Sequence, residues 1–171
     1  MFEIPIKMIE TVLLLILFVC AVIVVVSSIM VIREKMIIDS SINKLGIPKS
    51  QYADLVLKWC ISRINHAQIK KPQLIVSYEK DKRIWGVYRP SKNQMVIYVH
   101  KHETIRELTN TIIHEFVHAT QKNRSFNRSY DEFNKSLGYW NNPYEIESRA
   151  IAKDKEEECI LELRERFEIF K

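Results

Sequence analysis

The feature that most constrains the fold is an apolar stretch near the amino terminus, Thr11 to Ile32, which contains no charged residue, proline or glycine. About 20 such residues in a helix cross the hydrocarbon core of a bilayer. A core helix of so small a protein would rarely be apolar on every face. A cleaved signal peptide would be shorter and end in small residues, which Ser27-Ser28 followed by Ile29 matches poorly. We therefore predict a retained transmembrane anchor that contacts the lipid bilayer through residues 11–32.

Basic residues around this stretch predict its orientation and the division of the chain. Only Lys7 and the amino terminus precede it, whereas four basic residues follow it closely: Arg33, Lys35, Lys44 and Lys49. The positive-inside rule places the following part of the chain in the cytoplasm. We predict an anchor with its flanks over residues 1–35 and one compact domain over residues 36–171.

Charge and cysteine content exclude some partners. The chain has 26 lysines and arginines against 21 acids, a formal net charge of +5, and the charges are scattered rather than clustered. No nucleic-acid-binding motif is present, so we expect no nucleic-acid partner. One of the three cysteines, Cys20, lies in the apolar stretch, and the other two suggest no disulfide framework.

The sequence His114-Glu115-Phe116-Val117-His118 carries the candidate chemistry. Histidines four apart on a helix lie on one face and can bind the same metal ion, and the intervening glutamate can reach a metal-bound water. A helix here is predicted by an apolar stripe at helical spacing (Ile105, Leu108, Ile112, Phe116 and Ala119) and by Thr104 with Glu107, which form a capping box. The alternative is a surface helix whose imidazoles face water.

The surrounding pattern indicates an α+β domain. An amphipathic helix is predicted from Ser50 to Gln68, followed by three strands at 73–79, 83–89 and 94–100 that we expect to form an antiparallel meander. The turn between the first two strands is Lys80-Asp81-Lys82. The polar run from Lys122 to Asn142 is predicted to be loop-rich, and Asn142-Pro143 begins a C-terminal helix.

A catalytic zinc site usually has three protein ligands and a water. No histidine follows the motif, so the third ligand is expected to be a carboxylate, and Glu145 and Glu147 are the candidates. Glu147 shares a helix face with Tyr144 and Ile151, whereas Glu145 precedes Arg149 by four residues and suits an exposed ion pair. We therefore predict Glu147 as ligand and Glu145 as surface residue. Both acids also fit a first helical turn that complements the helix dipole.

The motif helix followed by a glutamate on a later helix resembles the gluzincin zinc metallopeptidases. The resemblance covers roughly Gln73 to Asp154, and its HExxH part is the specific one. It implies Zn²⁺ as cofactor, His114, His118 and Glu147 as metal ligands, and Glu115 as general base.

The same resemblance implies a zincin-like fold, with a short antiparallel sheet packed on the HExxH helix and a C-terminal helix. It also implies that strand 94–100 is an exposed edge along which a peptide binds antiparallel. The chain departs from the family pattern at Ile151, where an acidic residue four after the third ligand is usual. The residue that would hydrogen-bond the ligand histidines and hold their orientation is therefore unassigned.

The sequence thus predicts a membrane-anchored zinc metallopeptidase that acts on a peptide or protein. Tyr130, Tyr139 and Tyr144 are candidate donors to the oxyanion of the tetrahedral intermediate. His100 and His102 are expected to be loop histidines near the motif helix, and the alternative is that they line the site. The alternative function is a metal-binding, non-catalytic interaction domain tethered to the membrane.

Overall fold

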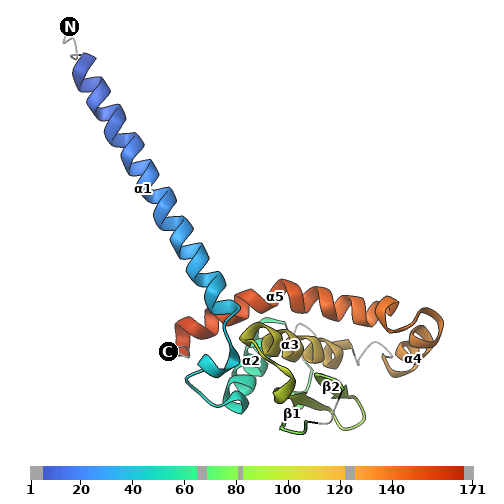
Figure 1. Cartoon of the computed structure of the whole chain (residues 1–171). Helices are drawn as coiled ribbons and strands as arrows, with labels where there is room; N and C mark the ends of the chain where they lie inside the picture. Colours follow the sequence, from blue (N-terminus) through green and yellow to red (C-terminus); the bar gives the residue numbers. More distant parts are fainter. Residues whose placement is uncertain (1–5, 65–68, 81–82, 122–125, 168–171) are drawn as a thin grey trace. The chain divides into compact units, whose positions relative to one another are not determined.

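The computed structural model describes residues 6–64, 69–80, 83–121 and 126–167 (Figure 1). Residues 1–37 and 38–171 form two compact units. The first unit is dominated by helix α1 (Ile6–Ile38). Between Val12 and Ile32 this helix is apolar and exposed, and it is long enough to cross a membrane. Its length and position fit a membrane anchor and also a signal sequence.

The second unit is α+β. Its main elements, in chain order, are α2 (Lys49–Arg63), β1 (Gln73–Ser77), β2 (Gly86–Arg89), β3 (Gln94–Tyr98), α3 (Ile105–Gln121), α4 (Phe126–Leu137) and α5 (Pro143–Phe167). Short 3₁₀ turns lie at Ile42–Lys44, Val99–Lys101 and Tyr139–Asn141. The predicted helix 50–68 corresponds to α2, and its last four residues, with the turn residues 81–82, lie outside the described residues.

The sheet is not the expected antiparallel meander. Its strand order is β1-β3-β2, with β1 parallel to β3 and β2 antiparallel to β3. The prediction that 94–100 forms an exposed edge is therefore wrong, because β3 is the central strand and its last four residues are buried. When all strands are short and apolar, the sequence pattern is a poor guide to which strands pair. In this sheet β2, and not β3, lies at an edge.

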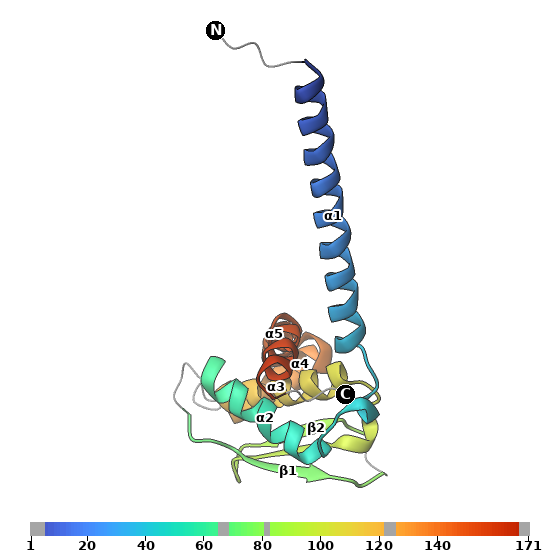
Figure 2. The same cartoon turned by 90° about the vertical axis from the view of Figure 1, so that its left-hand side faces the viewer.

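Helix α3 is the centre of the domain. In both views it lies between α5 and the sheet, with α2 also packed against it (Figures 1 and 2). Its predicted apolar stripe is buried throughout. The predicted capping box is confirmed, because the Thr104 hydroxyl accepts from the Glu107 amide and the Glu107 carboxylate accepts from the Thr104 amide. The capping box fixes the start of this helix, and packing on several sides fixes its rotation.

The segment after α3 is more helical than predicted. We expected loops from 122 to 142, but residues 126–137 form α4, and residues 122–125 lie outside the described residues. Phe126, Tyr130, Phe133 and Leu137 are spaced as a helical stripe that the polar composition conceals. The predicted start of α5 is confirmed, since the Asn142 side chain accepts from the Tyr144 amide.

Candidate metal centre

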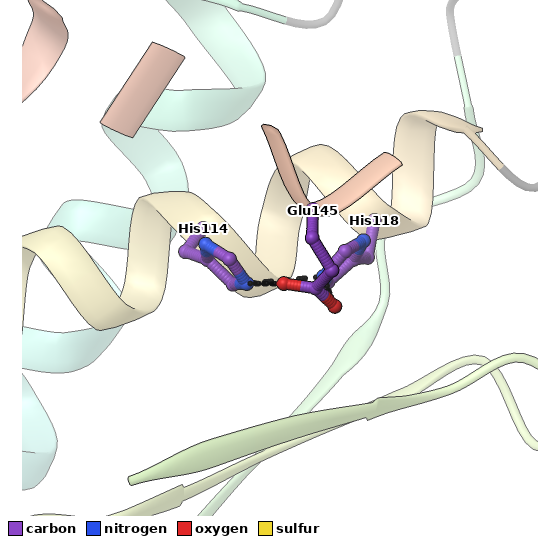
Figure 3. Close-up of side chains that lie close together, drawn as sticks. All are labelled: His114, His118 and Glu145. Atoms are coloured by element: carbon purple, nitrogen blue, oxygen red, sulfur yellow. Dashed lines mark hydrogen bonds and ion pairs between the residues drawn. The ribbon is translucent and has the colours of Figure 1, made fainter. Parts of the chain in front are cut away.

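Three side chains from two helices converge at the candidate site. His114 and His118 lie one turn apart on α3, with 3.0 Å between their Nε2 atoms. Glu145, from the first turn of α5, places Oε2 3.2 Å from His114 Nε2 and Oε1 3.2 Å from His118 Nε2. Figure 3 shows the carboxylate facing both imidazoles across the gap between the helices.

This arrangement fits a divalent metal ion. The three groups offer ligand atoms that all lie within 4.8 Å of one another. In a tetrahedral zinc site with bonds of about 2.0–2.1 Å, ligand atoms lie about 3.3 Å apart. Glu145 Oε2 is buried without a hydrogen-bond partner in the part of the chain that the structure describes. A metal would satisfy this oxygen, and two imidazoles with one carboxylate form a donor set that suits a divalent transition metal, zinc among them.

The structure brings Glu145, and not Glu147, to the histidines. Our expectation that Glu145 is a surface residue is wrong, because it is 2% exposed. The predicted ion pair with Arg149 forms, with Nη1 3.7 Å from Glu145 Oε2, but on the inner side of the helix. The inward face of α5 runs through Glu145, Ser148 and Ala152, so the apolar face that we assigned around Glu147 is not the buried one.

Charge interactions within the site are strong. Burial disfavours a charged Glu145, but the facing imidazoles of His114 and His118 outweigh it and hold the pKa of this carboxyl far below its usual range. Burial likewise lowers the pKa of His118, but the Glu145 carboxylate outweighs burial and raises it. Without a metal, the carboxylate therefore favours a cation beside it, as expected of a group placed to bind one.

Glu115 lies on the same side of α3 and faces the sheet edge. Its side chain is buried, and burial raises the pKa of its carboxyl despite the opposing effects of the two motif histidines and the Tyr88 amide. β2 passes very close here: a Cβ atom on Gly86 would lie 2.8 Å from Thr111 Cγ2 and 2.9 Å from Glu115 Cγ. Gly86 was not among the predicted site residues, although a glycine inside a strand is typical of close backbone approach.

A pocket of about 450 Å³ opens over these groups. Its lining includes His114, His118, Glu115 and Glu145, together with residues of the β2 edge and with Tyr130, Asp131 and Tyr139. Volumes of this size are typical of small-ligand sites in proteins. The pocket therefore joins the candidate metal ligands and the candidate base in one space.

The three candidate tyrosines have different positions. Tyr130 lines the pocket and its hydroxyl donates to Glu145 Oε1 at 2.7 Å. Tyr139 also lines the pocket, and burial together with the charge of Glu145 raises the pKa of its hydroxyl. Tyr144 is not part of the lining, and its ring lies 6.3 Å from that of Tyr130 and 6.1 Å from that of Phe133. The pocket thus brings together two of the three.

His100 and His102 lie away from the pocket lining. His100 Nε2 contacts the Lys80 carbonyl at 3.0 Å. His102 is 3% exposed, contacts Thr111 Oγ1 through Nε2 at 3.0 Å, and meets the Trp85 ring edge-on. Both lie in the connection before the motif helix, as expected, although His100 is part of the 3₁₀ turn Val99–Lys101. His102 belongs to the packing between that helix and the sheet.

Comparison with known proteins finds no relative. No family model matches the chain, and no curated protein and no solved structure matches it significantly. The resemblance to gluzincins therefore stays a prediction that rests on the residues of the site.

Proposed function

We propose that this chain is a membrane-anchored, zinc-dependent peptidase. The observation that supports this most directly is the group of His114, His118 and Glu145, whose ligand atoms lie within 4.8 Å of one another in a pocket that also contains Glu115. A domain that only held a metal for stability would not need a buried carboxylate in the same pocket. The position of Glu115 therefore favours catalysis over the non-catalytic alternative.

The two histidines and Glu145 would hold the zinc ion. When bound, zinc in such a site lowers the pKa of a water ligand and polarises the scissile carbonyl. Glu145 replaces Glu147 as the proposed third ligand. Glu115 accepts the proton of the attacking water and passes it to the leaving amine. Tyr130 and Tyr139 line the pocket and are the proposed donors to the oxyanion.

The substrate is proposed to be an extended peptide. β2 is an edge strand and contributes Gly86, Val87 and Tyr88 to the pocket lining. In the antiparallel ladder, Tyr98 donates to the Trp85 carbonyl, so the alternate residues Gly86 and Tyr88 direct their backbone groups away from β3. A peptide added along this edge would present its carbonyl groups beside the metal ligands. The apolar residues of this lining, Ile84, Val87 and Pro90, favour apolar side chains next to the scissile bond.

The apolar helix α1 is proposed to remain attached as a membrane anchor, with residues 36–171 on the cytoplasmic side. Its length and uniform exposure support a membrane span, and the excess of basic residues after it supports the orientation. Amino-terminal sequencing of the membrane-bound protein tests retention: a mature chain that begins after Ile32 would show a cleaved signal instead.

The test of catalysis uses the full chain in detergent micelles, loaded with Zn²⁺ and incubated with a peptide mixture read by mass spectrometry. We expect chelator-sensitive cleavage. The variant Glu115→Gln should retain the metal but lose cleavage by a factor of about 10²–10⁴, the usual contribution of a general base. The matched control is Glu157→Gln, an exposed position on α5. Cleavage by Glu115→Gln at the rate of the parent would exclude Glu115 as the base.

A further inference from the structure

Gln121 occupies the last turn of α3 and connects the metal centre to α5. It is 1% exposed. Its Oε1 lies 2.8 Å from His118 Nδ1, while its Nε2 lies 3.1 Å from the Tyr144 carbonyl and 3.0 Å from Glu147 Oε2. A single buried amide therefore contacts a candidate ligand at one end and α5 at the other.

These contacts determine the orientation of the amide. A carbonyl and a carboxylate can only accept hydrogen bonds, so the NH₂ group of Gln121 must face Tyr144 and Glu147. The amide oxygen must then face His118, and because it only accepts, His118 Nδ1 must carry the hydrogen. Ser148 Oγ, which donates to the Tyr144 carbonyl at 2.8 Å, is 3.2 Å from the same nitrogen and is compatible with this assignment.

The protonation of Nδ1 has a consequence for the other ring nitrogen. In the neutral imidazole, Nε2 then carries no hydrogen and can act as a metal ligand, and it is Nε2 that faces Glu145 and His114. Only this tautomer can bind a metal in the candidate site. The contact with Gln121 also fixes the rotation of the ring about its axis. The amide therefore prepares His118 both chemically and geometrically.

We propose that Glu147 and Gln121 form a relay that positions His118 for metal binding. The relay rests on the metal centre proposed above. Glu147 holds the NH₂ end of Gln121, and Gln121 in turn accepts from His118, so a carboxylate acts on the ligand through an intervening amide. Groups that hold ligand histidines in this way are expected to strengthen metal binding by about 10–100-fold.

The relay also gives a role to Glu147 and accounts for the departure at Ile151. Glu147 is the acid that sequence analysis chose as ligand, and the structure places it one contact behind a ligand. His118 is held by Gln121, which lies three positions later on the same helix. An acidic residue four positions after Glu145, where Arg149 stands, is therefore not required to orient His118. Gln121 and Glu147 are positioning residues, and neither is part of the pocket lining.

The test measures Zn²⁺ affinity of the full chain in detergent by competition with a chromophoric chelator, without any substrate. We expect Gln121→Met, which is similar in size but breaks both contacts, to weaken binding by about 10–100-fold. Glu147→Ala should weaken it less, by up to about tenfold, whereas Glu147→Gln, whose amide oxygen can accept the same hydrogen bond, should stay within about twofold of the parent. The double variant Gln121→Met with Glu147→Ala should be no weaker than Gln121→Met alone, because the two residues act in series.

Exposed positions provide the controls: Gln51→Met on α2 and Glu157→Ala on α5 should leave affinity unchanged. A second readout is the ¹⁵N spectrum of His118 in metal-free protein at alkaline pH, where the imidazole is neutral. The parent should show the Nδ1–H tautomer, and Gln121→Met should show a mixture. This spectrum also tests the relay if Gln121→Met binds too little metal to measure.

Two results would overturn the relay. One is an unchanged affinity and tautomer in Gln121→Met, and the other is a loss of metal in Glu147→Ala as large as in Glu145→Ala, which would make Glu147 a ligand. Failure of the proposed peptidase is a separate outcome, since it would appear as metal binding without cleavage. If the parent bound no zinc, the metal centre would fail, and the spectrum would still decide whether Gln121 sets the tautomer.

Discussion

The chain contains two pairs of histidines close in space to helix α3, and they differ in what faces them. His114 and His118 direct Nε2 atoms toward each other and toward the Glu145 carboxylate. His100 and His102, before the helix, contact a backbone carbonyl and a threonine hydroxyl. His118 and His102 are similarly buried. Burial of an imidazole therefore does not indicate a metal site. What indicates one is several possible ligand atoms that face the same point.

The electrostatic surroundings of the two pairs lead in opposite directions. The pKa of His118 is raised, because the Glu145 carboxylate outweighs the effect of burial. Burial lowers the pKa of His102 to about 4, and Glu107 only partly opposes this. The first environment attracts a cation and the second excludes one. Variants of the two pairs should accordingly differ in metal binding and in the response of stability to pH.

The largest expected difference is in metal binding. His118→Ala removes a proposed ligand and should lower Zn²⁺ affinity by roughly 10²–10³-fold, which is about 3–4 kcal/mol, a quarter of the binding energy of a four-ligand zinc site. His102→Gln should bind as tightly as the parent. Isothermal titration of the full chain in detergent measures both. Equal losses in the two variants would abolish the distinction between the pairs.

The second largest effect is expected from Glu145, the carboxylate that faces His114 and His118 but not the other pair. Glu145→Gln keeps the size of the side chain but removes its charge and should lower Zn²⁺ affinity by about 10–100-fold, because a neutral amide is a poor zinc ligand. The same chelator competition measures it, with Glu157→Gln as the exposed control. A variant that bound zinc as well as the parent would mean that another group completes the site.

The smallest effect concerns His102 and pH. With a pKa of about 4 in the folded protein and about 6.5 unfolded, this imidazole is neutral in both states above pH 6.5. Below that pH the unfolded chain takes up a proton that the folded protein does not. The free energy of unfolding should therefore fall by about 2 kcal/mol between pH 6.5 and pH 4.

His102→Gln does not titrate at this position and should show a flatter profile over the same range. Urea unfolding of metal-free protein at several pH values measures the difference between parent and variant. Parallel profiles would show that His102 does not remain neutral in the folded protein. The difference between the two proteins, rather than either profile alone, isolates this residue from the other titrating groups.

Local patterns were sufficient for much of the helical framework. Thr104 with Glu107, and Asn142 with Pro143, marked the starts of α3 and α5 correctly, because these capping contacts join residues only two or three apart. The apolar stripe of α3 predicted its buried face for the same reason. Helix α4 was missed although its aromatic residues recur at helical spacing, since its polar composition resembled a loop.

The pairing of strands and the choice of carboxylate were not accessible in this way. The order β1-β3-β2 depends on contacts between segments far apart in the chain, and short apolar strands fit several orders equally well. The choice of Glu145 depends on the rotation of α5 against α3. That rotation is set by the packing of the whole helix through Ser148, Ala152 and Glu156, whereas we judged it from one turn.

The sequence by itself determined the apolar helix, the α+β composition and the two histidines with their glutamate, because each depends on periodicity or on neighbours within a few residues. Only the tertiary structure decided that Glu145 completes the candidate metal centre and that Glu147 contacts it through Gln121. Two glutamates two residues apart on a helix point in directions about 200° apart. Which of them faces the histidines is fixed by helix packing, and that information is distributed over the whole domain.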